Sequence, residues 1–317
     1  MRIFANANYN FIKWRWHALI FSMAIIWGGV AWMATHGGVP LGIDFTGGTV
    51  VSVDFEKPTH EDLVRKALDP LFKDVGVQQV NEKGKNRIQI RLPEMKGQEE
   101  GRALEADANR IKAALEAANI GKFETAETNI VGPAMGKDLQ TKGIWATFAA
   151  LGGILIYVMF RFRFTFAVGA IVAAFHDILI TLVLLAFFHY DLSLNIIAGL
   201  LTITGYSVND TIVVFDRVRE NQRLSRREPL DQIVNRSVNQ TLGRTIITSG
   251  ATFLAVFALY LFGGEVLRGF AFTMLVGVVT GTYSTVFIAA AIAIILSRRE
   301  IAQATPAAVS TGKKKKS

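Results

Sequence analysis

The sequence predicts a polytopic α-helical membrane protein, with six transmembrane helices and one α+β domain between the first and the second. Of its 317 residues 51% are hydrophobic, and the mean hydropathy is +0.33. The apolar excess is uneven, because residues 35–140 form a polar, charged block. Each of six apolar runs is long enough to cross a bilayer as a helix. The runs are residues 17–34, 142–160, 165–188, 193–215, 244–262 and 270–296.

Residues 1–16 precede the first run and carry Trp14 and Trp16 at its start. Tryptophans in this place are typical of an interfacial anchor, so we interpret residues 1–16 as a cytosolic lead. The alternative is a cleaved signal peptide. We disfavour it because the apolar run is long for one, no A-x-A site follows, and further spans come later.

The block at 35–140 has the pattern of a ferredoxin-like domain. It reads in the order β-α-β-β-α-β, which is the split βαβ arrangement. The second helix is expected to stop near Gly121, and Thr59 with Asp62 predicts a capping box at the start of the first. The expected elements are a strand at 50–56, a helix from 58, a hairpin of 75–81 with 87–92 turning at Gly84, a helix at 98–119 and a strand at 122–131. Because the block contains no histidine cluster, nucleotide loop or nucleophile–base pair, we predict a binding or force-bearing module and no enzyme.

Charge and cysteine content exclude several functions. The chain contains no cysteine, so disulfides and thiolate metal sites are impossible, and no metal site is predicted. The net charge of +8 could indicate nucleic-acid binding. However, the basic residues lie in short segments beside apolar runs, which is the pattern of membrane topology. We therefore predict no nucleic-acid partner.

The distribution of arginine predicts the topology. Loop 216–243 carries six arginines, and Arg161, Arg163, Arg298 and Arg299 end two of the spans. The opposite connections hold one basic residue between them. The bias places both termini in the cytosol, with 35–140 on the other side and 297–317 as a basic tail without stable structure. Pro229–Gln240 is predicted to be an amphipathic helix on the membrane surface.

The stretch Asn195–Arg219 carries polar residues inside a spanning run. Its carboxylate Asp210 would cost a few kcal/mol in a bilayer. Helical spacing groups one stripe beside Asp210: Asn195, Gly199, Thr202, Tyr206, Asn209, Val213 and Asp216. The stripe is predicted to face other helices or a wet path. We favour a functional site for Asp210, such as a proton relay, over a purely structural carboxylate.

Three other spans carry small or polar stripes. Residues Gly169, Ala173, Asp177 and Thr181 follow one another at i+4 spacing, and His176 adjoins Asp177. Small residues let helices approach closely. His176 and Asp177 could handle a proton as a pair, or Asp177 could be a buried polar fastener; the sequence leaves both open. A GxxxG stripe in the last span, Thr273, Gly277, Gly281 and Thr285, is a packing signal.

Arg244 opens the fifth span, on one face with Thr248. Its long side chain could snorkel to the cytosolic interface. It could also reach inward toward Asp210 as a counter-charge. Burial penalises a charged carboxylate and a nearby cation favours it, so the second arrangement would leave Asp210 poised to switch. The sequence does not decide between the two.

Two motifs resemble the signatures of the SecD/SecF family of protein-export membrane proteins. They are Gly42–Gly48, GIDFTGG, and Gly205–Asn221, GYSVNDTIVVFDRVREN. Six spans with one large domain after the first match the SecF branch of that family. The resemblance covers the chain to about Ser297. It implies the resistance-nodulation-division fold in a bacterial inner membrane, with residues 35–140 periplasmic.

The resemblance also implies a function and partners. Family members of this branch pair with SecD beside the SecYEG channel, and YajC and YidC are further candidate partners. The pair would use the proton motive force, without a cofactor, to help export unfolded preproteins. In the family, proton coupling is attributed to an aspartate and an arginine that fall on Asp210 and Arg244. Two rivals stay open: a small-molecule or lipid exporter of the same superfamily, and a non-transporting assembly factor.

The family motif contains Gly42, Asp44, Gly47 and Gly48. Glycines at Gly47 and Gly48 permit a sharp change of direction after the first span. We favour a tight turn into the first strand, and a hinge at the same place is compatible with it.

Overall fold

The computed structural model describes residues 7–72, 75–82, 85–92, 102–225 and 227–304. The chain divides into two compact units. One is a helix bundle, formed by residues up to Pro40, by Thr147–Tyr190 and by the chain from Asn195 onward. The other contains a sheet and comprises Leu41–Ala146 together with Asp191–Leu194.

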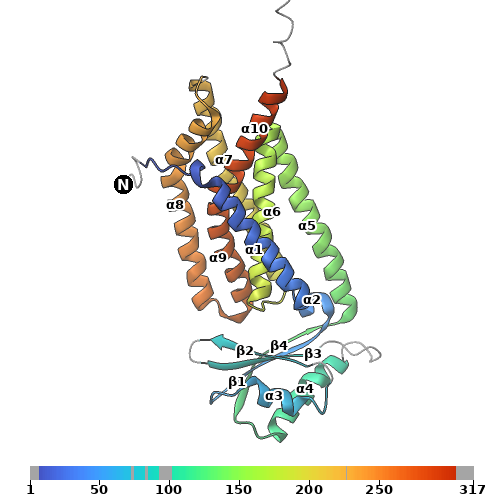
Figure 1. The fold of residues 1–317 in the computed structure, drawn as a ribbon. Coiled ribbons are helices and arrows are strands. Elements are labelled where there is room, and N and C mark those ends of the chain that lie inside the picture. Colours follow the sequence, from blue (N-terminus) through green and yellow to red (C-terminus); the bar gives the residue numbers. More distant parts are fainter. Residues whose placement is uncertain (1–6, 73–74, 83–84, 93–101, 226, 305–317) are drawn as a thin grey trace, which may run out of the picture. The chain divides into compact units, whose positions relative to one another are not determined.

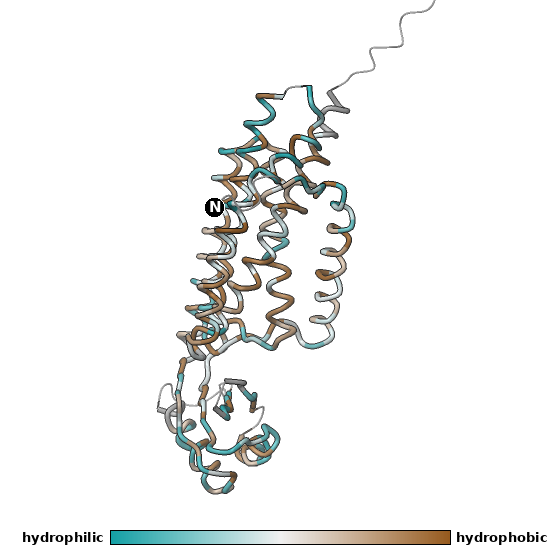
Figure 2. The backbone as a smooth tube through the Cα atoms, turned by 90° about the vertical axis from the view of Figure 1, so that its left-hand side faces the viewer, coloured by the Kyte–Doolittle hydropathy of each residue, from teal (hydrophilic) through white to brown (hydrophobic). Residues whose placement is uncertain are grey.

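The bundle contains six helices, within the described residues, that are long and apolar enough to span a membrane. This confirms the predicted number (Figure 1). They are α1 (Arg15–Thr35), α5 (Pro133–Arg161), α6 (Phe164–Phe187), α7 (Leu194–Leu224), α8 (Leu230–Phe262) and a last span built from α9 (Gly264–Ser284), η2 (Thr285–Ala289) and α10 (Ala290–Ala304). Figure 2 shows hydrophobic residues along the lengths of these helices and hydrophilic residues concentrated at their ends.

The last span changes its winding in the middle. η2 is one turn of π-helix between two α-helices. Such turns are rare and occur often at functional sites. α6 packs against it, and also against α1, α9 and α10, so α6 lies at the centre of the bundle.

Small residues allow these helices to approach, as the sequence predicted. A Cβ atom on Gly169 of α6 would lie 2.7 Å from the carbonyl oxygen of Ala289. A Cβ on Gly281 of α9 would lie 3.0 Å from the Cβ of Ser207 on α7. Larger side chains at these positions would force the helices apart, since packed interiors leave no free volume.

The sheet-containing unit has the predicted ferredoxin-like order. Its strands pair antiparallel in the order β2-β3-β1-β4. Buried side chains of β1 and β3, such as Val51 and Ile88, form its core with Leu68 of α3 and Leu115 of α4. The elements are α2 (Ile43–Thr46), β1 (Gly48–Phe55), α3 (Glu61–Leu68), β2 (Gly76–Glu82), β3 (Lys85–Leu92), α4 (Arg102–Ala117) and β4 (Phe123–Val131).

The capping box predicted for Thr59 and Asp62 is wrong. Helix α3 begins at Glu61, and its N-cap is His60, without a side-chain cap bond. The hydroxyl of Thr59 instead donates to the carbonyl of Lys57 at 3.1 Å, so it points back along the chain. The predicted turn at Gly84 and residues 98–101 of the predicted second helix lie outside the described residues.

The surface helix predicted at Pro229–Gln240 is also wrong as a separate element. These residues open α8, one continuous helix of 33 residues. Its amphipathic face is used inside the bundle, where Val234 and Val238 are buried. On the same helix Asn239 accepts a hydrogen bond from the backbone N–H of Tyr9 at 2.8 Å. The last helix likewise continues to Ala304, so residues 297–304 of the predicted unstructured tail are helical, and the rest of that tail lies outside the described residues.

We expect Gly277→Ala to lower the stability of the bundle. The new methyl group would overlap the side chain of Ile203, which is buried on α7. Overpacking of this kind costs about 1–3 kcal/mol. The free energy of unfolding, measured by titrating the purified protein with sodium dodecyl sulfate, should fall by that amount.

The matched control is Gly250→Ala on α8, where the added methyl group meets no atom within 4 Å. A second substitution, Ile203→Ala, should restore part of the stability lost at Gly277 by making room. Equal effects of the two glycine substitutions would contradict the packing that we describe.

Candidate functional site

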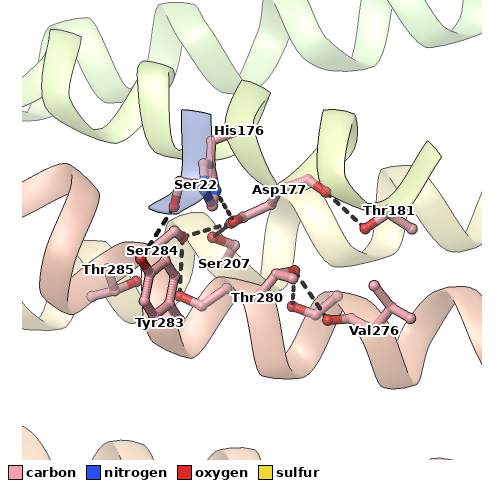
Figure 3. A network of polar contacts seen from close by, with 12 residues as sticks. Ser22, His176, Asp177, Thr181, Ser207, Val276, Thr280, Tyr283, Ser284 and Thr285 are labelled. Carbon is pink, nitrogen blue, oxygen red and sulfur yellow. Dashed lines mark hydrogen bonds and ion pairs between the residues drawn. The ribbon is translucent and has the colours of Figure 1, made fainter. Parts of the chain in front are cut away.

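Asp177 lies at the centre of a polar cluster inside the bundle (Figure 3). Its side chain is fully buried on α6. The hydroxyls of Ser207 on α7 and Ser284 on α9 both donate to its Oδ2, at 2.6 and 2.7 Å. Nδ1 of His176 lies 3.0 Å from the other carboxylate oxygen, Oδ1. The carboxylate therefore joins three helices and has a partner on each oxygen.

His176 extends the cluster toward α1. Its ring stacks on Tyr283 of α9, with centroids 6.1 Å apart. The hydroxyl of Tyr283 donates to the carbonyl of Ala18 at 2.8 Å and accepts from Ser22 at 3.1 Å. Within the described part of the chain, Nε2 of His176 is buried without a hydrogen-bond partner. The structure brings His176 and Asp177 together, and their role in proton transfer stays a prediction.

Asp210 has a different environment. It is 6% exposed on α7. Its Oδ1 accepts a hydrogen bond of 3.2 Å from Thr245 on α8. Among the described residues, nothing donates to Oδ2, although this atom is buried. A buried acceptor without a donor carries a desolvation penalty of about 1–3 kcal/mol, and more when it is charged.

Further hydroxyls connect the surroundings of Asp210. Tyr206, one turn earlier on α7, donates to Ser249 of α8 at 3.3 Å. Thr282 of α9 donates to the same hydroxyl at 2.9 Å. We call Tyr206, Asp210, Thr245, Ser249 and Thr282 the Asp210 group. It joins α7, α8 and α9.

Helix α7 takes part in both polar groups, because it carries Asp210 and also supplies Ser207 to Asp177. Tyr206 and Asp210 bond to α8, whereas the next residues along, Ser207 and Thr211, bond elsewhere. Ser207 reaches Asp177, and Thr211 lies 2.8 Å from the hydroxyl of Thr285, the first residue of the π-helical turn. A small rotation or shift of α7 would therefore alter both polar groups at once.

Arg244 is not paired with Asp210 in this structure. Its side chain is exposed, and no ion pair links it to the carboxylate in the described part of the chain. Its neighbour Thr245 makes the contact instead. Both alternatives from the sequence, an interfacial arginine and an inward counter-charge, are compatible with this position.

The polar stripe predicted on α7 is only partly covered by the described residues of this chain. Asn195, Thr202 and Asn209 are exposed, as is Thr248 on α8, although Asn195 still donates to the carbonyl of Val266 on α9 at 3.3 Å. Between Asn195 and Asp216, the buried polar residues of α7 are Thr204, Ser207, Asp210 and Thr211. They lie beside the stripe, because a one-residue step turns a helix by about 100°. The sequence does contain a signal for this buried face, because Ser207 and Thr211 follow one another at i+4 spacing.

The family motif builds a tight turn. After α2, Gly47 and Gly48 have φ angles of 72° and 127°, which only glycine adopts without strain. Oδ2 of Asp44 accepts the backbone N–H of Leu194, the first residue of α7, at 2.9 Å. Gly42 donates to the carbonyl of Leu192 at 2.7 Å, and a Cβ on Gly42 would collide with that oxygen. The interpretation of Gly47 and Gly48 as a tight turn into the first strand is confirmed.

An ion pair joins the same segment to the sheet. Arg91 of β3 pairs with Asp191, and both lie in the sheet-containing unit. Burial lowers the pKa of Arg91 from its ordinary value. The segment Asp191–Leu194 is thus held by Asp44, Gly42 and Arg91, none of which is near it in the sequence.

Comparisons with known proteins agree with this architecture. The C-terminal domain of the protein export membrane proteins SecD/SecF matches residues 110–299, and the SecD/SecF GG motif matches residues 32–59. Protein translocase subunit SecF of Rhodothermus marinus is 41% identical over 96% of this chain and 98% of its own length. The subunit of the same name from Escherichia coli O157:H7 is 40% identical over 92% of this chain and 88% of its own.

A solved structure has the same fold. The crystal structure of SecDF, a translocon-associated membrane protein from Thermus thermophilus, superposes with a TM-score of 0.82 at 34% identity. The match covers 94% of this chain and 40% of the SecDF chain, so this chain spans less than half of that protein.

The six spanning helices and the buried polar groups define a multi-pass membrane protein of a transport family. The chain belongs to the SecD/SecF family of protein export membrane proteins, and the relatives that it matches over most of its length are SecF subunits.

We expect Ser207→Ala and Ser284→Ala each to destabilise the bundle by about 1–3 kcal/mol, because each removes a donor from a buried carboxylate. Because both serines bond to the same oxygen, their effects should not be additive. The free energy of unfolding in sodium dodecyl sulfate measures this.

The control is Thr280→Ala, whose hydroxyl bonds only to carbonyls of its own helix. Its effect should stay within about 0.5 kcal/mol. Serine substitutions as mild as this control would show that Asp177 does not depend on these hydroxyls.

Proposed function

We propose that this chain acts as a SecF-type subunit that works with SecD to couple the proton motive force to protein export across the bacterial cytoplasmic membrane. The observation that carries the proposal is Asp210, a buried carboxylate on a spanning helix with one oxygen to which no described residue donates. A group that is costly to bury and incompletely bonded has an alternative state available, which is its protonated form.

The proposed step is a change of charge at Asp210. In the protonated form the unbonded oxygen carries the proton and no anion is buried. In the ionised form Oδ2 needs a donor, and Arg244, exposed beside Thr245, is the cation whose side chain can supply it. A proton that crosses the full field releases about 2.3 kcal/mol per 100 mV. That is enough to bias an element with two states of similar free energy.

Helix α7 offers a route from the carboxylate to the start of the same helix. Its first N–H is held by Asp44, which belongs to the sheet-containing unit, as Leu194 itself does. A shift of α7 that follows protonation of Asp210 would pull on this hydrogen bond. The proposal needs no cofactor and no enzymatic step.

Exposed polar residues on spanning helices support a partner half. Thr202 and Asn209 on α7 and Arg244 and Thr248 on α8 are uncovered by the described residues of this chain. Polar side chains at such positions rarely face lipid. A second six-helix half, which we propose to be SecD, would cover them. We further propose cytosolic termini and a periplasmic sheet-containing unit from the arginine bias, with SecYEG, YajC and YidC as partners implied by the family resemblance.

We expect Asp210→Asn to leave folding intact and to abolish proton-dependent export. Asparagine keeps the size of the side chain and can still accept from Thr245, but it cannot titrate. Export of a preprotein would be followed by pulse-chase in cells, with and without a protonophore. The variant should lose at least about tenfold in rate and should no longer respond to the protonophore.

The control is Asp216→Asn, which changes a partly exposed carboxylate two turns later on the same helix. It should export at nearly the rate of the unmodified protein. Proton-dependent export by the Asp210→Asn variant at normal expression would remove Asp210 from the mechanism.

We expect single cysteines at Asn209 and Thr248 to form cross-links to SecD. The chain has no cysteine of its own, so each introduced thiol is the only one in it. A thiol-reactive photo-cross-linker attached at either position should capture SecD, detected by immunoblot.

A cysteine at Ile20 serves as the control, because Ile20 is exposed on α1, a different helix, which packs on α6. It should give no SecD adduct. Adducts of equal yield at all three positions would speak against a partner on the α7–α8 face.

A further inference from the structure

A cavity with a strongly basic lining lies at the arginine-rich end of the bundle. Its volume is about 700 Å³, which is within the range of small-molecule sites. It forms where α5 ends and α6 begins, beside the last turns of α7. Four arginines line it together with two buried rings: Arg161, Arg163, Arg219, Arg223, Phe166 and Phe215.

Among the described residues, carboxylates form ion pairs with only one of the four arginines of this cavity. Arg161 is neutralised, because its guanidinium nitrogen Nη2 lies 2.6 Å from both carboxylate oxygens of Asp216. The side chains of Arg163, Arg219 and Arg223 form no hydrogen bond or ion pair with any other described residue. Three like charges around one space repel one another unless an anion lies between them.

Packed aromatic rings form part of the wall of the cavity. Phe166 and Phe215 meet edge to face with centroids 5.0 Å apart, and both are buried. The guanidinium of Arg161 lies 5.1 Å from the ring centroid of Phe162. Arg163 is the N-cap of α6 and makes no side-chain cap bond, so the positive end of this helix adds to the field. A preorganised basic site of this kind is suited to an anion.

We propose that this cavity binds a phosphate group, and that the group is the phosphodiester of an anionic membrane lipid. Guanidinium groups bind phosphate oxygens with two parallel hydrogen bonds, which favours phosphate over smaller anions. Basic pockets between spanning helices recognise lipid headgroups through the same chemistry.

Exposed aromatic side chains favour a lipid over free phosphate. Phe160 is 90% exposed and Phe164 is 71% exposed, and they flank Arg161 and Arg163 along the chain. Aromatic side chains beside cationic ones are typical of the bilayer interface. A lipid would place its headgroup among the arginines and its acyl chains against these rings. The proposal stands independently of proton coupling at Asp210.

The test measures lipid binding to the full-length chain in detergent by native mass spectrometry. Phosphatidylglycerol is the anionic probe, and phosphatidylcholine is the neutral comparison. We expect one phosphatidylglycerol to bind at least about tenfold more tightly than phosphatidylcholine. The triple variant Arg163→Gln/Arg219→Gln/Arg223→Gln should lose this difference, since each basic residue contributes about fivefold.

The matched control is Lys13→Gln/Arg217→Gln/Arg227→Gln, which removes the same charge outside the cavity lining. It should change the affinity for phosphatidylglycerol by less than about threefold. If both triple variants lose binding equally, only general charge matters and the cavity is not a site. If the first triple variant fails to fold, Arg219→Gln alone should weaken binding about fivefold, and an unchanged affinity would overturn the proposal.

Inorganic phosphate distinguishes the two sources of the ligand. Equilibrium dialysis with radiolabelled phosphate should show affinity far below that for phosphatidylglycerol. If phosphate binds as tightly as the lipid, and the same triple variant loses this binding, the assignment of the ligand as a lipid is wrong. The cavity would then be a site for free phosphate.

Discussion

The burial of two carboxylates in an apolar bundle is the constraint on which the rest of the membrane part depends. Asp177 is tolerated because two serine hydroxyls and an imidazole bond to it. The serines come from α7 and α9 and the carboxylate from α6, so these helices must be close enough for hydrogen bonds of 2.6 and 2.7 Å. This closeness in turn requires glycine at Gly169 and Gly281, where a Cβ would meet a neighbouring helix. The hydrogen bonds to Asp177 therefore depend on the small residues that let the helices approach one another.

Asp210 departs from this pattern, and this departure is the basis of the change of charge that we propose for it. The same helix that supplies a serine to Asp177 also carries Asp210, yet Thr245 is the only described residue whose side chain bonds to the Asp210 carboxylate. A fully bonded carboxylate favours its charged form, because its donors bond more strongly to the anion than to the neutral acid. For a carboxylate with an unbonded oxygen, the charged and the protonated forms differ less in free energy. We therefore propose that the two carboxylates have different roles, with Asp177 holding the helices together and Asp210 changing its charge, and that α7 contacts both groups.

Sequence patterns predicted the elements better than their contacts. Hydropathy and spacing were sufficient for six spans, for the ferredoxin-like order and for Asp177 and Asp210 as the exceptional residues. The donors Ser207 and Ser284 were not found, because a serine in a spanning helix can bond to a carbonyl of its own helix instead. The continuity of α8 was missed for a similar reason. A basic amphipathic segment is compatible with a membrane surface and with a bundle interior, and the partners that decide, Tyr9 among them, are more than 200 residues away.

The arginines at one end of the bundle illustrate the limit of reading charge from sequence. Their number sets the expected topology, and for that purpose their arrangement is irrelevant. The structure separates them into two kinds. Arg15, Arg161 and Arg236 each pair with a carboxylate, and these pairs hold helix ends together. Arg163, Arg219 and Arg223 instead surround one cavity over buried aromatic rings. Topology alone would be served equally well by dispersed charges, so their convergence calls for an anion as its physical reason.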